Sequence, residues 1–156
     1  MKIALILMAS GFGRRFGGHK LETLVHGRPL YTYGMKSLCQ AAQAFLPCSG
    51  IDCQVTVVTA HAAIASACRD QGIDVVWNDQ AGEGMAASLR CAVEACHDAG
   101  AWAFFPADQP LLTSETVAVP LFSAVFMGRN CFGCTVILAG ANSCAVPRPG
   151  FIGRSK

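Results

Sequence analysis

Apolar residues along this chain occur in four short, nearly unbroken runs, and the stretches between them have helical spacing. The four runs are Ile3–Ala9, Val55–Thr59, Asp74–Trp77 and Ala101–Phe105. They lack the alternation of apolar and polar residues that a half-exposed strand shows, which is typical of parallel strands covered on both faces. We therefore predict four parallel strands.

Between these runs the apolar residues recur on single helical faces. The first face consists of Leu30, Gly34, Leu38, Ala41 and Phe45, and the second, before Gly72, of Ile64, Ala67 and Cys68. The third, which ends near Gly100, consists of Met85, Leu89, Val93 and Cys96. Alternating strands and helices imply right-handed crossovers, so we predict an α/β fold with a three-layer, open, mostly parallel sheet. Ligands of such sheets bind beyond the carboxyl ends of the strands.

The segment after the first run, LMASGFGRRFGGHK at positions 7–20, combines glycines with cations. Glycines leave backbone N–H groups open to an anion, and Arg and Lys add positive charge. The segment is not a dinucleotide fingerprint, because Phe16 stands at the third glycine position. It is not a P-loop either, because His19 separates Gly18 from Lys20 and Leu21 follows the lysine. The pattern favours a polyphosphate ligand.

The spacing of this segment resembles the signature of MobA-like nucleotidyltransferases, in particular the enzymes that attach a nucleotide to the molybdenum cofactor. The matching positions are Ala9, Ser10, Gly11, Gly13, Arg15, Phe16, Gly17, Lys20 and Leu21. The resemblance implies a Rossmann-like nucleotidyltransferase fold and a nucleotide-binding role for the loop. It implies that Gly11 and Gly13 offer N–H groups to the triphosphate. Arg15 would then hold the β- and γ-phosphates, and Lys20 would neutralise charge near the α-phosphate.

Asp108 follows the fourth run in the sequence FFPADQPL. Considered alone, this carboxylate is expected to cap a helix that starts near Thr113. The resemblance instead implies a metal-binding turn in which Asp108 holds Mg²⁺ beside the phosphates. Gln109 and Pro110 are similar to the residues that follow this Asp in the family members that use CTP.

A third match comprises Asn78 and the segment Gly84-Met85-Ala86-Ala87-Ser88-Leu89. Gly-Met-x-x-Ser-Leu is typical of the cytidylyltransferase branch, which implies that Asn78, Gly84, Met85 and Ser88 surround the base or ribose. Helix capping by the Gly-Glu-Gly turn, with Met85 as core, is the alternative. We assign Ser88 to nucleotide binding and Leu89 to the core. His61, which follows the second run after Ala60, is expected to be solvated, to cap a helix or to line the same rim.

Composition narrows the remaining choices. The net charge of +2 is too small to indicate a nucleic-acid partner, and the first apolar run is far shorter than the roughly 18 residues of a membrane span. Nine cysteines, several in predicted helix interiors, favour reduced thiols in a cytoplasmic protein. The single C-x-x-C, Cys131 and Cys134, is weak support for a metal or redox site.

The sequence changes character near residue 128. We predict a nucleotidyltransferase domain at 1–127 and an atypical segment at 128–156, which is basic and contains no Asp or Glu. Family members provide a late Gly-Asp that helps hold the metal, and no acidic residue follows Glu115 here. Two interpretations stay open: a basic terminal tail, or a segment altered by truncation or a shifted reading frame.

The resemblance implies a Mg²⁺-dependent cytidylyltransferase that moves CMP from CTP to the terminal phosphate of molybdopterin cofactor and releases pyrophosphate. Arg15, Lys20 and Asp108 are the expected catalytic residues. A molybdoenzyme or its chaperone is a further candidate partner. Two alternatives stay open: transfer of guanylyl or another nucleotidyl group, and a non-catalytic descendant that binds nucleotide or cofactor.

Overall fold

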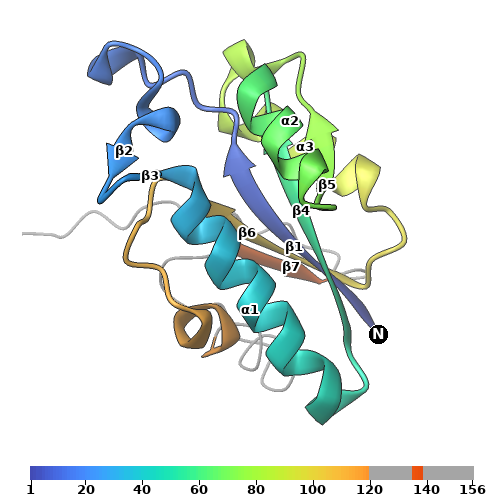
Figure 1. The fold of residues 1–156 in the computed structure, drawn as a ribbon. Coiled ribbons are helices and arrows are strands. Elements are labelled where there is room, and N and C mark those ends of the chain that lie inside the picture. The colour runs from blue at the N-terminus through green and yellow to red at the C-terminus, as the bar shows by residue number, and fades with distance from the viewer. Residues whose placement is uncertain (120–134, 139–156) are drawn as a thin grey trace, which may run out of the picture.

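The computed structural model describes residues 1–119 and 135–138, which form a five-stranded sheet in the order β5-β4-β1-β6-β7 (Figure 1). The strands are β1 (Lys2–Ala9), β4 (Asp52–Thr59), β5 (Asp74–Trp77), β6 (Ala101–Pro106) and β7 (Thr135–Leu138). The first four are parallel, and β7 runs antiparallel to β6. All four predicted strands, and the mostly parallel sheet, are confirmed.

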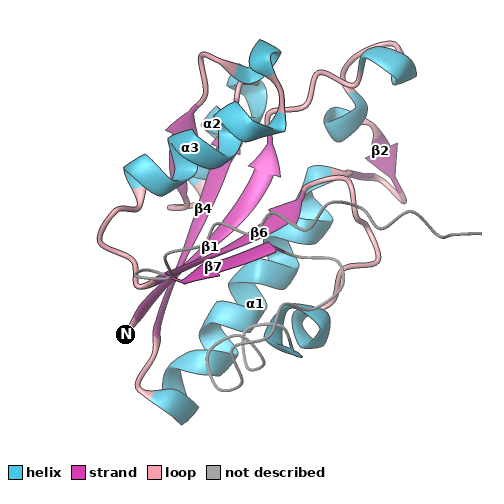
Figure 2. Ribbon diagram, turned by 180° about the vertical axis from the view of Figure 1, so that it is seen from behind, coloured by secondary structure: helices cyan, strands magenta, loops and turns pink. Residues whose placement is uncertain are grey.

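Helices cover both faces of the sheet (Figures 1 and 2). Helices α1 (Tyr31–Ser49) and α2 (Ala62–Asp70) pack against one face, and α3 (Met85–Ala95) packs against the other. This arrangement confirms the three layers. Helix α3 ends earlier than predicted, and the indole Nε1 of Trp102 donates a hydrogen bond of 2.9 Å to the carbonyl oxygen of Cys96 just beyond it.

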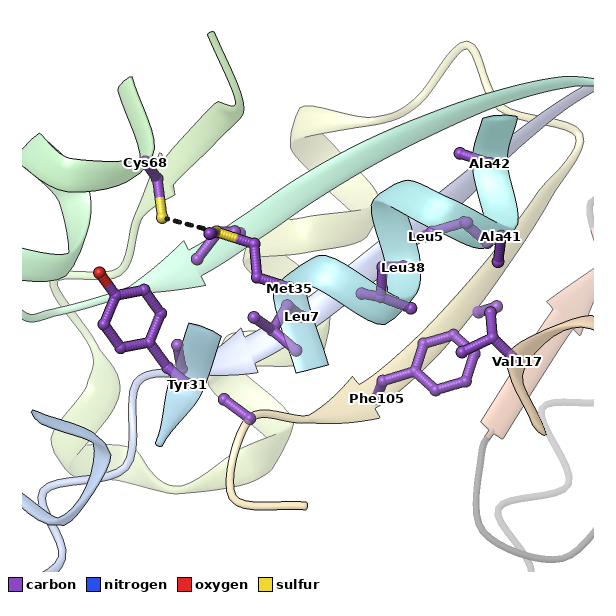
Figure 3. Packing of buried hydrophobic residues seen from close by; sticks show 14 of the residues in the cluster. Leu5, Leu7, Tyr31, Met35, Leu38, Ala41, Ala42, Cys68, Phe105 and Val117 are labelled. Carbon is purple, nitrogen blue, oxygen red and sulfur yellow. Dashed lines mark hydrogen bonds between the residues drawn. The ribbon is translucent and has the colours of Figure 1, made fainter. Parts of the chain in front are cut away.

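The sequence of the central strand β1 contains almost no polar residues because both faces of the strand are buried. Ile3, Leu5 and Leu7 contribute to the core beneath α1 and α2, whereas Ala4 and Ile6 contribute to the core beneath α3. Figure 3 shows the first of these clusters, which packs on one face of the strand and includes Tyr31, Met35, Leu38, Ala41, Ala42, Cys68, Phe105 and Val117. Burial on both faces therefore requires a continuous apolar run.

An excursion of short elements between β1 and α1 was not predicted. It contains the 3₁₀ turns η1 (Arg14–Phe16) and η2 (Lys20–Glu22), followed by a hairpin of β2 (Leu24–Val25) and β3 (Arg28–Pro29). His26 and Gly27 at the tip both have positive φ, 48° and 78°, as a two-residue type I′ turn requires. This excursion extends beyond the carboxyl end of β1 (Figure 1).

The strand order reverses between β1 and β6. From β1 the chain proceeds to β4 and β5 on one side, and it then crosses back to place β6 on the other side. Ligands of open α/β sheets bind at such a reversal, outside the carboxyl ends of the strands. The backbone N–H of Ala107 donates to the carbonyl oxygen of Met8 over 3.1 Å, so the segment that carries Asp108 lies beside the exit of β1.

No helix within residues 1–119 and 135–138 is both long enough and apolar enough to cross a bilayer.

Candidate active site

The segment Ser10–Lys20, called the glycine loop below, is anchored to the neighbouring strand at its start. The buried hydroxyl of Ser10 donates to the carbonyl oxygen of Val58 over 3.1 Å. Thr59 of β4 donates from Oγ1 to the carbonyl oxygen of Ala9 over 3.0 Å. Ala9 and Ser10 are thus buried where the loop leaves the sheet, and the Ser10 side chain serves this anchorage.

Beyond its anchor the glycine loop folds into a compact turn. The carbonyl oxygen of Gly13 accepts hydrogen bonds from the N–H groups of Phe16, at 2.8 Å, and Gly18, at 3.1 Å. Gly13, Gly17 and Gly18 have φ values of 59°, 87° and 92°, which only glycine adopts at little cost. No atom lies within 4 Å of the place that a Cβ on Gly11, Gly17 or Gly18 would occupy. A ligand can therefore approach this backbone closely.

Two cations of the glycine loop face one open pocket of about 470 Å³. The pocket is lined by Gly13, Arg15, Phe16 and Lys20. Arg15 is exposed, and none of the ion pairs among the described residues includes it. Its guanidinium is free to make the forked contact that phosphate oxygens favour.

Lys20 connects the pocket to the exit of β6. Its Nζ lies 2.7 Å from Oδ2 of Asp108, and the two side chains are 38% and 42% exposed. The contact joins residues 88 positions apart in the sequence. The three residues that were expected to be catalytic, Arg15, Lys20 and Asp108, therefore lie at the point where the strand order reverses.

Asp108 does not cap the following helix. Residues 114–119 are helical, and the hydroxyl of Thr113 accepts a hydrogen bond of 3.2 Å from the N–H of Thr116, which is the geometry of an N-cap. The capping interpretation of Asp108 is therefore wrong. Its exposed carboxylate remains available to ligands other than Lys20.

Asn78 and Ser88 lie at the carboxyl end of β5 and in the first turns of α3. Both are buried, and the amide Nδ2 of Asn78 donates to Oγ of Ser88 over 2.8 Å. The N–H of Asn78 donates to the carbonyl oxygen of Thr59 over 2.9 Å, which links this end to β4. Gly84 has a φ of 100°, and the Met85 side chain is 70% exposed. Met85 is thus not a core residue.

The structure therefore divides the predicted nucleotide-binding residues into two groups. Gly13, Arg15 and Lys20 share one pocket, and Asp108 joins them through its ion pair. Asn78 and Ser88 bond to each other on the β4–β5 side of the same rim and are not among the residues lining that pocket.

Two further residues at this rim are Thr59, which the sequence did not single out, and His61, for which the sequence left alternatives open. The sequence predicts Thr59 only as the end of a strand, yet Thr59 forms hydrogen bonds to both Ala9 and Asn78. Of the alternatives for His61, the structure places it at the rim: its side chain is only 12% exposed, and its Nε2 lies 3.1 Å from the carbonyl oxygen of Gly11. Its position directly after a parallel strand, where ligand sites form, was the available signal.

The described residues can provide a partial metal site. Among residues 1–119 and 135–138, no three His, Cys, Asp or Glu side chains gather where they could hold a metal ion. Mg²⁺ is commonly held by one or two carboxylates together with substrate phosphates rather than by protein ligands alone. The single carboxylate of Asp108 beside a cationic pocket fits that mode of binding.

A sheet of this order, with a glycine-rich cationic loop at its reversal point, is typical of nucleotide-binding α/β domains. The sequence profile of the MobA-like NTP transferase domain matches residues 4–126. This chain belongs to that family of nucleotidyltransferases. No curated protein matches the chain in sequence.

Solved structures show the same fold at low sequence identity. A nucleotidyl transferase from Methanothermobacter thermautotroptrophicus is 23% identical, with a TM-score of 0.60 over 76% of this chain and 56% of that one. A CMP:2-keto-3-deoxy-manno-octonic acid synthetase complexed with CTP is 20% identical, with a TM-score of 0.60 over 80% and 48%. A Mycobacterium tuberculosis protein in complex with manganese is 20% identical, with a TM-score of 0.57 over 80% and 60%. This chain spans about half to three fifths of their lengths.

Proposed function

We propose that the chain is a Mg²⁺-dependent cytidylyltransferase, which moves CMP from CTP to the terminal phosphate of molybdopterin cofactor and releases pyrophosphate. The observation that carries the proposal is the juxtaposition of Arg15 and Lys20 in one pocket with the carboxylate of Asp108 2.7 Å from Lys20. Transfer to a phosphate acceptor needs positioning and charge neutralisation more than a general base, because a phosphate monoester is already an anion at neutral pH.

In this proposal the glycine loop binds the triphosphate. Gly11 and Gly13 donate backbone N–H groups, Arg15 holds the β- and γ-phosphates, and Lys20 exchanges its bond to Asp108 for one to the α-phosphate. An oxygen of the acceptor phosphate bonds to the α-phosphorus while the bond from that phosphorus to the β-bridging oxygen breaks, and pyrophosphate leaves with the electron pair. Mg²⁺, held by Asp108 and the phosphates, supplies positive charge to the leaving group when bound.

The choice of CTP rests on the resemblance of two segments. Gln109-Pro110 after Asp108, and Gly84-Met85-x-x-Ser88, are similar to the cytidylyltransferase branch, and one protein with this fold is complexed with CTP. We place the base against the open backbone of Gly84 and the exposed Met85. Asn78 and Ser88 are joined by a hydrogen bond at the start of α3, and we assign the Ser88 hydroxyl, which accepts from Asn78, to a hydrogen bond with a ribose or base oxygen.

The test is pyrophosphate release with molybdopterin as acceptor, Mg²⁺, and CTP, GTP, ATP or UTP in separate reactions. We expect CTP to give the highest kcat/KM, and Asp108→Asn to abolish turnover while the far-ultraviolet circular dichroism spectrum stays unchanged. A preference for GTP contradicts the cytidylyl assignment, and an active Asp108→Asn variant contradicts the metal role.

A non-catalytic descendant that binds nucleotide in the cytoplasm and passes a cofactor to a molybdoenzyme is the second candidate. It is favoured by the absence, among the described residues, of any cluster of three His, Cys, Asp or Glu side chains that could hold a metal ion. Nucleotide binding without pyrophosphate release in the same assay would support this candidate, and sustained turnover would eliminate it.

A further inference from the structure

We propose that His61 is a positioning residue, which holds the glycine loop in the shape that binds a nucleoside triphosphate. This inference rests on the proposed function, because it assigns to His61 the ordering of the loop that the proposal makes the phosphate site. His61 comes from the other side of the rim, 50 residues from Gly11 in the sequence.

The backbone of His61 is fixed at the exit of β4. Its N–H donates to Oγ1 of Thr59 over 3.0 Å, and that same hydroxyl donates to the carbonyl oxygen of Ala9 over 3.0 Å. His61 precedes α2, yet its side chain makes no capping hydrogen bond to that helix. The imidazole is directed instead toward the glycine loop.

At the start of the loop, Nε2 of His61 lies 3.1 Å from the carbonyl oxygen of Gly11. A carbonyl oxygen can only accept, so Nε2 carries the hydrogen in this contact. The ring of Phe12 meets the imidazole edge-on, with 5.9 Å between the ring centroids and an interplanar angle of 62°. These contacts fix the peptide between Gly11 and Phe12, whose N–H precedes the proposed phosphate-binding turn.

Just beyond the glycine loop, Nδ1 of the same imidazole lies 3.9 Å from Oε1 of Glu22, within the range of an ion pair but longer than a hydrogen bond. Glu22 belongs to η2 together with Lys20, so the contact reaches the turn that carries the pocket cation. One side chain, only 12% exposed, thus contacts the start of the glycine loop and lies beside the turn in which the loop ends.

Fixing the start of the glycine loop matters because the turn that follows contains three glycines with positive φ. Glycine-rich backbone has many accessible conformations, and ordering it on binding would weaken the affinity for a nucleotide. A clamp that orders the loop beforehand removes part of this cost. His61 is therefore expected to affect nucleotide affinity rather than the chemical step.

The experiment compares His61→Phe with His61→Gln in the full chain. Phenylalanine keeps a ring against Phe12 but has no donor, whereas the glutamine amide nitrogen reaches as far along the side chain as Nε2. The matched control is His97→Phe, since His97 is exposed after α3 and contacts the carbonyl oxygen of Glu94. CTP affinity is measured by calorimetry with Mg²⁺, and KM and kcat are measured by pyrophosphate release.

We expect His61→Phe to weaken CTP binding and raise KM about tenfold, with kcat changed by less than about twofold. His61→Gln and His97→Phe should match the wild type. Wild-type affinity in His61→Phe, or equal weakening in His61→Gln, overturns the inference. If His61→Phe does not fold, His61→Asn replaces it, because its shorter amide cannot reach Gly11. Failure of the wild type to bind any nucleotide contradicts the proposed function itself.

Discussion

Replacing Lys20 by methionine separates a structural role of its ion pair from a role in nucleotide binding. The pair with Asp108 is short, at 2.7 Å, but both side chains are more than a third exposed. Exposed pairs contribute about 0.2–1 kcal/mol to stability because water screens the charges. For a chain of this size, the thermal midpoint should therefore fall by less than about 4 °C.

The effect on nucleotide binding should be much larger. A charge-assisted hydrogen bond to a phosphate contributes about 1.5–3 kcal/mol, which corresponds to roughly 10- to 150-fold in affinity. Lys20→Met should therefore weaken the binding of CTP with Mg²⁺ by that factor in a calorimetric titration, while differential scanning calorimetry shows nearly the wild-type midpoint.

Lys2→Met provides the matched control. Lys2 pairs with Asp98 at 2.6 Å at the opposite end of β1, far along the strand from the glycine loop. We expect this variant to bind CTP as the wild type does. A large loss of stability in Lys20→Met with unchanged CTP affinity would refute the reasoning, because it would make the pair structural.

Three further expectations follow from local geometry. In Gly13→Ala, the new Cβ would lie 2.9 Å from Cβ of Lys20 at a φ of 59°, so stability should fall by about 1 kcal/mol or more in urea titrations, together with CTP affinity. Ser88→Ala leaves the buried Asn78 amide without its acceptor, so the free energy of unfolding should fall by about 1–3 kcal/mol. An unchanged midpoint of urea unfolding would contradict this expectation. Burial raises the pKa of the Cys68 thiol to about 11, so peptide mapping should find it unalkylated at pH 8 until the protein unfolds.

The raised pKa of Cys68 also predicts how the stability of the folded chain changes with pH. Because the folded-state value lies above the ordinary value of 9.0, the folded chain holds this proton more tightly than the unfolded chain. The contribution of this thiol to the free energy of unfolding is complete below pH 9 and decreases as the pH rises toward 11.

The main sheet could be predicted because burial on both faces leaves a strong sequence signal. Asp74–Trp77 was predicted with the bounds that the structure has, and Ile3–Ala9 differs by one residue. The hairpin of Leu24–Val25 and Arg28–Pro29 could not be found in this way, because two-residue strands carry no periodicity. Strand Thr135–Leu138 lies in a segment whose pattern was too irregular to predict, yet it pairs with β6.

The candidate site was predictable where its chemistry is concentrated in the sequence. The spacing of Gly13, Arg15 and Lys20 identified the glycine loop, and the position of Asp108 after a strand placed it on the same rim. His61 could not be assigned from sequence, since its contact with Gly11 depends on the register between β1 and β4, which pairs Ala9 with Thr59. The bond between Asn78 and Ser88 likewise depends on how α3 packs.

The most direct measurement is a crystal structure of the full chain with Mg²⁺ and a non-hydrolysable CTP analogue. The account predicts triphosphate oxygens within hydrogen-bonding distance of Arg15 and Lys20, over the backbone of Gly13, with the metal ion on Asp108. A nucleotide bound at a site remote from these four residues would contradict it.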